Sequence, residues 1–286
     1  MTDLNIPWFD SAIAKLSDPQ NQRVWSIIVS LFGDMAQQNG DCINGQTLTQ
    51  IITPMGIKPE AIRVALHRLR KDGWIDSHKS GRASVHVLTD LGRRQSAEVT
   101  PRIYAAAAVP AQAWHLVIAE DGQSTALEPL LEQSTYFSVN RSTALGLCAP
   151  PRGGRDLLVV QDPEMRVPGW FQDRLFPADL CQACATLEQV LAAVLGMDLR
   201  HAADGMAHRE AGQSALPPLT ELQIVTLRTL VVHRWRRVVL RHPDLPASFH
   251  PKAWRGEPCR QLVAELLSHL PRPQLTASGD LQQAND

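Results

Sequence analysis

Cationic side chains recur on one side of a helix that the sequence predicts over residues 59–71. Four of them fall at spacings of three, four and seven residues: Arg63, His67, Arg70 and Lys71. Such spacings place side chains on one face of an α-helix. The apolar residues of the segment form the opposite stripe: Ile62, Ala65, Leu66 and Leu69. A helix that buries one side and offers cations on the other suits a duplex that carries about one phosphate charge per 1.7 Å.

Positive charge is concentrated in the part of the chain that contains this helix. Residues 58–102 hold ten Lys and Arg against five Asp and Glu, whereas the whole chain of 286 residues has a net charge of −1. The composition, with 44% apolar and 20% charged residues, can build a sizeable core and excludes wholesale disorder. A basic segment inside a nearly neutral chain indicates a local anionic partner.

The elements around the cationic helix form a recognisable order. The apolar pattern predicts helices over 23–35 and 45–53, a turn at 54–56 and then the helix 59–71, which Gly73 closes. Two short strands are expected at 74–76 and 83–88, joined by a polar hairpin that contains glycine. Helix, helix, turn, helix and hairpin make a winged helix-turn-helix, in which the helix after the turn enters the major groove.

The winged motif predicts two kinds of contact with double-stranded DNA. Base edges are assigned to Arg63 and His67. Phosphates are assigned to Thr47, to the backbone near Lys58 and to Lys79 and Arg82 at the hairpin tip, which could also reach a minor groove. Arg70 and Lys71 are further DNA-binding candidates, with no kind of contact assigned. The alternative is a solvated basic helix in a non-catalytic protein-interaction regulator, which keeps the winged fold without specific DNA binding.

The rest of the chain predicts two further domains. A linker helix is expected at 89–98, strands at 114–119, 136–139, 143–147 and 157–161, helices at 125–133, 177–200, 220–242 and 260–270, and disorder from Pro271. The expected fold is therefore α+β and mainly helical. We divide it into a winged domain with its linker helix (1–104), a small α+β middle domain for dimerisation or effector binding (105–200) and a helical C-terminal domain with a disordered tail (201–286).

The helix at 220–242 begins at a capping box, Thr220 with Gln223, and is rich in arginine: Arg228, Arg234, Arg236, Arg237 and Arg241. Two interpretations stay open. The arginines could form a second nucleic-acid surface, or the helix could pack against another domain or subunit and leave its guanidinium groups in solvent.

The sequence gives little support for a metal site, a phosphate-binding loop or an enzymatic active site. The set Cys181, Cys184, His201 and His208 has gaps longer than the zinc-finger spacings of about 12 and 3–5 residues, so no metal site is predicted. Arg152 and Arg155 flank a glycine pair that could bind a phosphate or form a plain surface turn. Hydrolase, phosphate-loop and dinucleotide motifs are missing, so we expect neither an enzyme nor a cofactor.

The sequence also indicates a compartment. The residues after Met1 have neither a basic nor an apolar signal region, no run of 18 strongly apolar residues suggests a membrane span, and five scattered cysteines are not typical of a disulfide framework. We expect a cytoplasmic protein without a membrane partner.

At both ends the residues resemble the PaaX-like transcriptional regulators, the phenylacetate-degradation repressors. The N-terminal matches are Phe32-Gly33-Asp34, Gly56-Ile57, Ala61-Ile62-Arg63, Asp72-Gly73-Trp74, Leu91-Gly92-Arg93 and Arg102-Ile103-Tyr104. The C-terminal matches are His233, Arg236-Arg237, Arg241-His242-Pro243-Asp244-Leu245-Pro246 and Trp254-Arg255-Gly256. The chain departs from the family pattern at His86, His242 and Arg255, where the family often has Tyr, Asp and Pro.

The resemblance implies a homodimeric repressor on a palindromic operator. It also implies a ferredoxin-like middle domain, whose first strand is similar to the segment around Trp114. An acyl-CoA effector such as phenylacetyl-CoA would release the repressor from DNA. Candidate effector contacts in that region are Trp114, Arg152 and Arg155.

Overall fold

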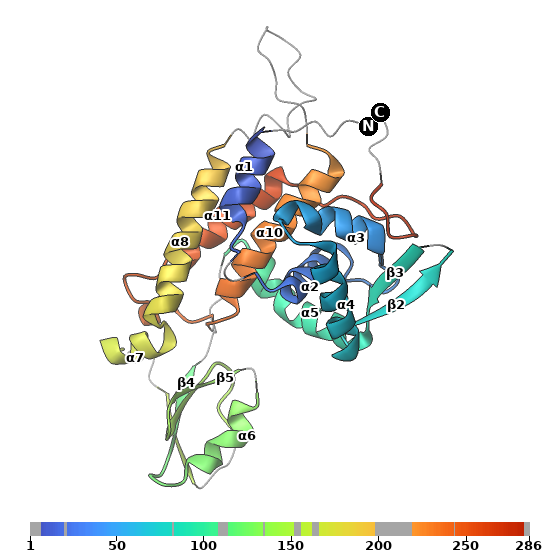
Figure 1. Ribbon diagram of the computed structural model, residues 1–286. Helices are drawn as coiled ribbons and strands as arrows, with labels where there is room; N and C mark the ends of the chain where they lie inside the picture. The colour runs from blue at the N-terminus through green and yellow to red at the C-terminus, as the bar shows by residue number, and fades with distance from the viewer. Residues whose placement is uncertain are drawn as a thin grey trace. The chain divides into compact units, whose positions relative to one another are not determined.

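The protein is described by a computed structural model that is α+β and mainly helical, as expected (Figure 1). The structure describes residues 7–19, 22–81, 83–107, 114–133, 135–151, 156–161, 166–197, 219–242 and 244–282. Two compact units divide the chain. The first unit comprises residues 1–106, 186–237 and 257–286, and the second comprises residues 107–185 and 238–256.

The N-terminal part of the first unit is helical. Its elements are α1 (Pro7–Leu16), α2 (Val24–Met35), the short strand β1 (Ile43–Asn44), α3 (Gly45–Ile52), the 3-10 turn η1 (Thr53–Met55) and α4 (Pro59–Lys71). The Asn44 side chain caps α3 by accepting the Gln46 N–H at 2.8 Å. Gly56 has a φ of +78°, which lets the chain turn sharply between η1 and α4.

A three-stranded antiparallel sheet follows α4. Strand β2 (Ile75–Ser80) pairs with β3 (Ala83–Leu88) from Ile75 opposite Leu88 to Ser80 opposite Ala83, and β1 pairs with the other edge of β3. Helix α5 (Asp90–Tyr104) then begins at Thr89, whose hydroxyl accepts the Gly92 N–H and donates to Gly73 O. Gly92 must lack a side chain, because a Cβ would lie 2.3 Å from Trp74 O.

The sequence predicts a linker helix that ends near Glu98, but α5 continues through Pro101 to Tyr104. Proline interrupts the hydrogen bonding of a helix, so the extension needs another source of stability. Side chains from distant parts of the chain supply it. The Trp235 indole donates to Ile103 O at 3.0 Å, and the Arg260 guanidinium donates to Arg102 O at 2.9 Å.

Among the described residues, three more helices contribute to the first unit: α8 (Ala178–Leu195), which starts in the second unit, α10 (Glu221–Val239) and α11 (Gly256–His269). The predicted capping box of α10 is confirmed. The Gln223 N–H reaches the Thr220 hydroxyl at 3.3 Å, and the Thr220 N–H reaches the Gln223 amide oxygen at 3.0 Å.

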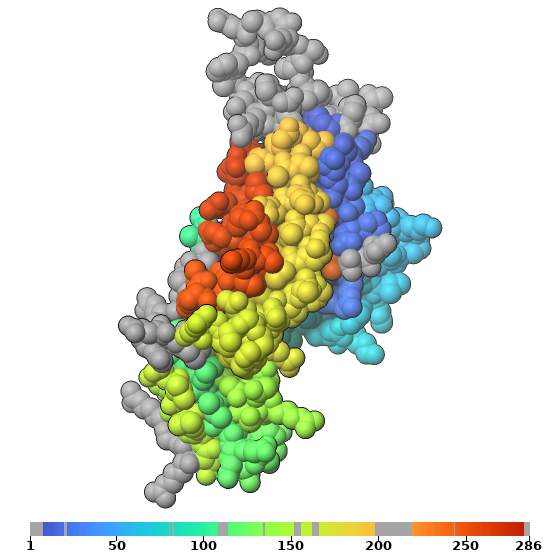
Figure 2. Space-filling model, turned by 90° about the vertical axis from the view of Figure 1, so that its left-hand side faces the viewer, coloured from blue at the N-terminus to red at the C-terminus, as the bar shows by residue number. Residues whose placement is uncertain are grey.

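By length and composition α8 could cross a membrane, and among the described residues it is the one helix of that kind. It is nevertheless amphipathic. Leu187, Leu191 and Val194 are buried, whereas its other side reaches the surface as the yellow strip of Figure 2. That pattern is typical of a helix packed against a protein core.

The second unit is built on a four-stranded antiparallel sheet in the order β5-β6-β4-β7. Its strands are β4 (His115–Ala119), β5 (Tyr136–Asn140), β6 (Thr143–Gly146) and β7 (Leu157–Val160), close to the four predicted segments. Its helical pieces are η2 (Ser124–Leu127), α6 (Glu128–Leu131), the unpredicted α7 (Gly169–Leu175) and η3 (Ala247–Phe249).

The composition beyond Pro271 predicts disorder, whereas the structure places residues 271–282 on the first unit. Leu275 and Leu281 form an antiparallel bridge, and the turn between them contacts the start of α3. Contacts with residues more than 200 positions earlier are what order this polar segment, so no local pattern reveals them.

Candidate nucleic-acid interface

Helix α4 packs by its apolar stripe and exposes the opposite side. Ile62, Ala65, Leu66 and Leu69 are all buried. All charged side chains of the helix are exposed, together with Val64 and His67: Glu60, Arg63, Arg68, Arg70 and Lys71. The four predicted cations are therefore brought together on one solvent-facing surface, where a phosphate or a base edge could reach them.

The outward cations are held only by weak contacts. Arg63 pairs with Glu60 at 2.9 Å, but both side chains are about 70% exposed, so the pair contributes little and exchanges readily with another anion. Arg68 lies 5.3 Å from the ring of Trp25 and pairs with Asp72 at 3.4 Å. Within the described part of the chain, neither the His67 nor the Lys71 side chain makes a hydrogen bond or ion pair.

Lys58 precedes the first turn of α4 and is exposed. Its extended backbone leads into Pro59, and its carbonyl accepts the N–H groups of Ala61 and Ile62. Lys58 therefore lies exposed beside the first turn of α4, where the predicted phosphate contact is sterically possible.

The β2–β3 hairpin presents Lys79 to solvent opposite Ser84, whereas Arg82 lies outside the described residues. The base of the hairpin contains a residue that the site prediction omitted. His86 is buried and lies 2.7 Å from the Ser77 hydroxyl. Burial, with a smaller effect from Arg70, lowers the pKa of His86 to about 4 and keeps the ring neutral.

Thr47, predicted to touch a phosphate, is buried rather than exposed. Its hydroxyl donates to the carboxylate of Asp280 at 2.9 Å. The two residues are 233 positions apart, so the sequence carries no signal for this contact.

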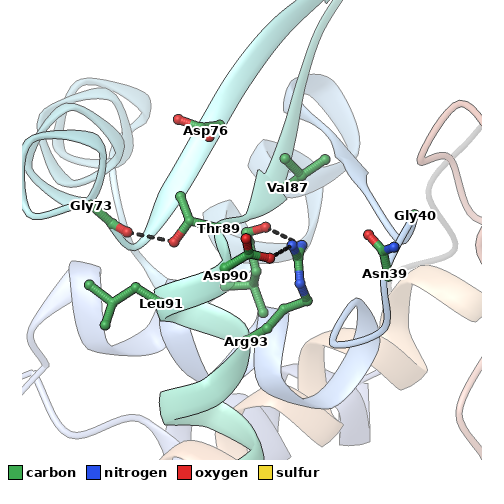
Figure 3. Close-up of a pocket in the computed structure, with 10 residues that line it drawn as sticks. Asn39, Gly40, Gly73, Asp76, Val87, Thr89, Asp90, Leu91 and Arg93 are labelled. Atoms are coloured by element: carbon green, nitrogen blue, oxygen red, sulfur yellow. Dashed lines mark hydrogen bonds and ion pairs between the residues drawn. The ribbon is translucent and has the colours of Figure 1, made fainter.

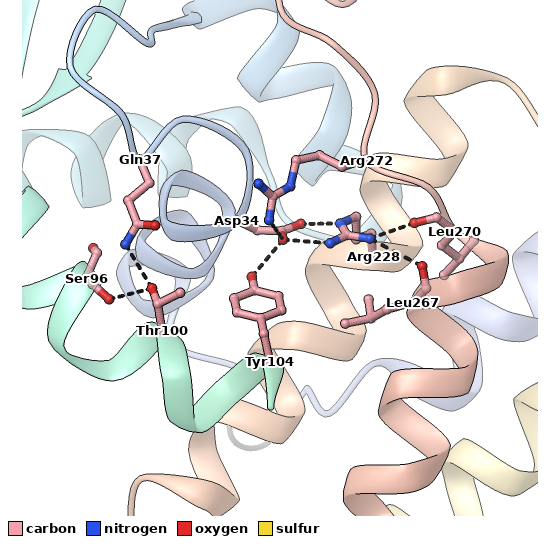
Figure 4. A network of polar contacts seen from close by, with 9 residues as sticks. All are labelled: Asp34, Gln37, Ser96, Thr100, Tyr104, Arg228, Leu267, Leu270 and Arg272. Carbon is pink, nitrogen blue, oxygen red and sulfur yellow. Dashed lines mark hydrogen bonds and ion pairs between the residues drawn. The ribbon is translucent and has the colours of Figure 1, made fainter. Parts of the chain in front are cut away.

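A buried ionic network joins α2 to the C-terminal helices (Figure 4). The Asp34 carboxylate accepts two hydrogen bonds from the Arg228 guanidinium, one from the Tyr104 hydroxyl at 2.6 Å and one from Arg272 at 3.3 Å. Arg228 also donates to Leu270 O at 2.7 Å. The Asp34 carboxylate is inaccessible and the Arg228 side chain is buried, so this pair serves to hold the unit together.

Two more arginines of α10, and Arg241 just beyond its end, bind protein groups as well. Arg234 donates to the carbonyls of Lys15 and Leu16 at the end of α1, and Arg237 pairs with Asp18. In the second unit, Arg241 pairs with Asp179 at 2.5 Å. These contacts favour the packed helix over the second nucleic-acid surface.

An open hollow of about 560 Å³ lies between the hairpin and the start of α5 (Figure 3). Asp76 and Asp90 line it, and its one cation, Arg93, is bound to Asp90 and to Leu88 O. Carboxylates in excess repel an anion, so this hollow does not suit a phosphate-bearing effector.

The predicted effector residues are only partly described. Trp114 packs edge-on against Phe249, with ring centroids 5.0 Å apart, in an apolar cluster of the second unit. Arg152 and Arg155 lie outside the described residues, as do His201 and His208. Cys181 and Cys184 are buried, and the Cys181 thiol donates to Phe176 O.

A buried polar pair in the second unit also escaped the sequence prediction. His115 is inaccessible, and its Nε2 lies 3.2 Å from the Tyr136 hydroxyl. Gly146 makes room for both rings, since a Cβ there would lie 2.4 Å from His115. Burial lowers the pKa of His115 and raises that of Tyr136 to about 12, so both groups stay neutral at physiological pH.

Two family models match the chain. The model described as PaaX-like protein matches residues 23–92, and the PaaX-like protein C-terminal domain matches residues 201–275. The transcriptional repressor PaaX of Escherichia coli (strain K12) is 27% identical in an alignment 263 residues long, which covers 84% of this chain and 78% of that protein. The first match runs from α2 into α5, and the second includes α10 and α11, so both ends of the Asp34–Arg228 pair lie in matched segments.

Proposed function

Because the chain belongs to the PaaX-like family of transcriptional regulators, we propose that it is a repressor that reads double-stranded DNA with α4. The observation that carries the proposal is the division of α4 into a buried apolar side and an exposed cationic side. A major groove accepts a helix of this kind, and phosphates on either side attract its charges.

In this proposal α3, η1, α4 and the β2–β3 hairpin act as a winged helix-turn-helix. Arg63 and His67 contact base edges from the second and third turns of α4. The remaining cations of the surface contact phosphates and set the register: Lys58, Arg70, Lys71, Lys79 and Arg82. Thr47 joins them once its hydroxyl is released from Asp280.

We further propose a cytoplasmic, non-enzymatic homodimer on a palindromic operator, with its two α4 helices about one helical turn of DNA apart. The second unit is its candidate for dimerisation and effector binding. The strand order β5-β6-β4-β7, all antiparallel, is the order of a ferredoxin-like sheet, which supports the ferredoxin-like fold that the resemblance implies for this unit. An acyl-CoA of the phenylacetyl-CoA type would release the repressor by binding the free form more tightly than the DNA-bound form.

Selection of duplexes from a random pool, followed by fluorescence anisotropy, tests the DNA-binding proposal. A repressor is expected to bind its selected duplex at least ~10³-fold more tightly than a random one. Binding that is weak, equal on all duplex sequences and abolished by modest salt would favour the protein-interaction regulator. A panel of CoA thioesters added to the preformed complex then tests effector release, and free CoA serves as the control.

A further inference from the structure

The last described residues form a compact turn on the first unit. The Leu275–Leu281 bridge closes it. Inside the turn, the Thr276 N–H donates to Asp280 O at 2.8 Å, and the Ser278 hydroxyl donates to the Asp280 carboxylate at 3.0 Å. The turn is thus shaped by its own hydrogen bonds, with the Asp280 carboxylate held in place.

This turn docks at the junction of β1 and α3, where the dark red segment of Figure 1 lies beside α3 and β3. The Asn44 N–H donates to Gly279 O at 2.8 Å, and the Thr47 hydroxyl donates to Asp280 at 2.9 Å. The approach is close. Gly279 has a φ of +78°, and a Cβ on it would lie 2.6 Å from Asn44 N.

The position of the carboxylate matters because α3 is the helix that precedes the turn to α4. In helix-turn-helix proteins this helix crosses the DNA backbone, and its first turn attracts anions through its N–H groups and its dipole. Thr47 is the third residue of α3 and the one hydroxyl that the sequence assigned to a phosphate. In the structure that hydroxyl already holds an anion supplied by the chain itself.

We propose that residues 275–282 are a built-in competitor of DNA, in which the Asp280 carboxylate takes the place of a backbone phosphate at the start of α3. Duplex binding has to displace the turn, so the free protein binds DNA less tightly than its α4 surface allows. The apparent affinity is reduced by the fraction of molecules in which the turn is docked. The inference rests on the proposed DNA binding and adds a regulated step to it.

Two single variants undock the turn by different means. Asp280→Asn weakens the contact with Thr47, and Gly279→Ala blocks the close approach to Asn44 without any change in charge. Each is expected to raise affinity about threefold to tenfold, the range of the net contribution of one typical hydrogen bond. The gain should be equal on selected and random duplexes, because a phosphate contact carries no sequence information.

Asp286→Asn is the matched control, since it removes the same charge six residues further on, outside the described residues. A general effect of charge would raise affinity equally in Asp280→Asn and Asp286→Asn and would fade between 0.1 and 0.3 M salt as screening increases. If the turn competes directly with DNA, the gain in affinity should persist at 0.3 M salt in Asp280→Asn and Gly279→Ala and should be absent in Asp286→Asn.

Amide hydrogen exchange at Asn44 gives a second readout that does not depend on affinity. Exchange at Asn44 should accelerate in Gly279→Ala without DNA, and in the natural chain when a duplex is added. If the natural chain binds DNA, yet both undocking variants bind no more tightly and only melt earlier, the turn is a structural clasp and the inference is wrong. If the natural chain binds no duplex, the proposed function itself fails, whereas accelerated exchange in free Gly279→Ala would still report docking.

Discussion

Asp34 and Arg228 are 194 residues apart in the chain and form a buried two-point ion pair, with Arg228 Nε 2.6 Å from Oδ2 and Nη2 3.0 Å from Oδ1. The pair connects α2, which packs against the proposed recognition helix, to α10. Among the described residues, both charges are satisfied by each other and by Tyr104, Arg272 and the carbonyls at the end of α11. The proposed DNA-binding part and the C-terminal helices therefore depend on each other within one folded unit.

Removal of one partner of this pair should therefore strongly destabilise the fold. Asp34→Asn or Arg228→Met leaves an uncompensated buried charge, and we expect either to lower the free energy of unfolding by about 3–5 kcal/mol. The double variant should lose less than the sum of the two. Urea denaturation measures all three. Arg272→Ala is the control, because that side chain is half exposed and its loss should cost at most about 1 kcal/mol.

The orientation of α4 predicts that substitutions on its two sides have different effects, one on DNA binding and the other on stability. Arg63→Ala should weaken binding to the selected duplex by about 1–3 kcal/mol if it contacts a base edge bidentately, and the fold should survive. Leu66→Ala should instead cost about 2–5 kcal/mol of stability, because it empties a core position. Anisotropy and thermal melting of both variants distinguish the two effects. Unchanged binding by Arg63→Ala would show that α4 faces the groove with another side.

The hairpin tip should contribute affinity without specificity. The double variant Lys79→Ala, Arg82→Ala is expected to weaken binding to selected and random duplexes by similar factors. Its slope of log K against log salt should shrink by about 2, at ~0.9 per lost phosphate contact. An unchanged slope with a lower melting temperature would mean that these residues brace the hairpin.

His86 predicts a loss of stability in mild acid. Its pKa is about 4 in the folded protein and ~6.5 in the unfolded chain, so the unfolded chain binds more protons between these values. The free energy of unfolding should fall as pH drops from about 6.5 to 4, by up to ~3 kcal/mol, and this residue adds no further loss below that. His86→Gln should flatten that part of the profile in urea titrations. Burial also lowers the pKa of His233 to about 4, so this residue should still contribute its part of the fall in the free energy of unfolding in the His86→Gln variant.

Local signals predicted the parts of the fold that local interactions stabilise. Helix α4 followed from its apolar spacing, and the start of α10 followed from the reciprocal bonds of Thr220 and Gln223, which lie three residues apart. The antiparallel strands of the second unit likewise followed from short apolar runs between turn residues. The cationic surface was predictable for the same reason, since helical spacing alone sets which residues share a face.

Long-range contacts account for what the sequence did not show. The extension of α5 past Pro101 depends on Trp235 and Arg260, which donate to carbonyls more than 130 residues away. The burial of Thr47 depends on Asp280, and the order of the C-terminal segment depends on the same contact. Neither pairing leaves a periodic or compositional mark, so no reading of one segment by itself could find them.

The separation of Asp34 from Arg228 also has a consequence for synthesis on the ribosome. At ~5–20 residues per second, Asp34 is made roughly 10–40 seconds before its partner. During that interval the N-terminal helices cannot enclose the carboxylate without leaving it unpaired, and the end of α5 lacks the Trp235 and Arg260 side chains that stabilise it. The nascent DNA-binding part is thus expected to stay incompletely folded until translation is nearly finished, which would delay its capture of DNA until the whole chain has been released.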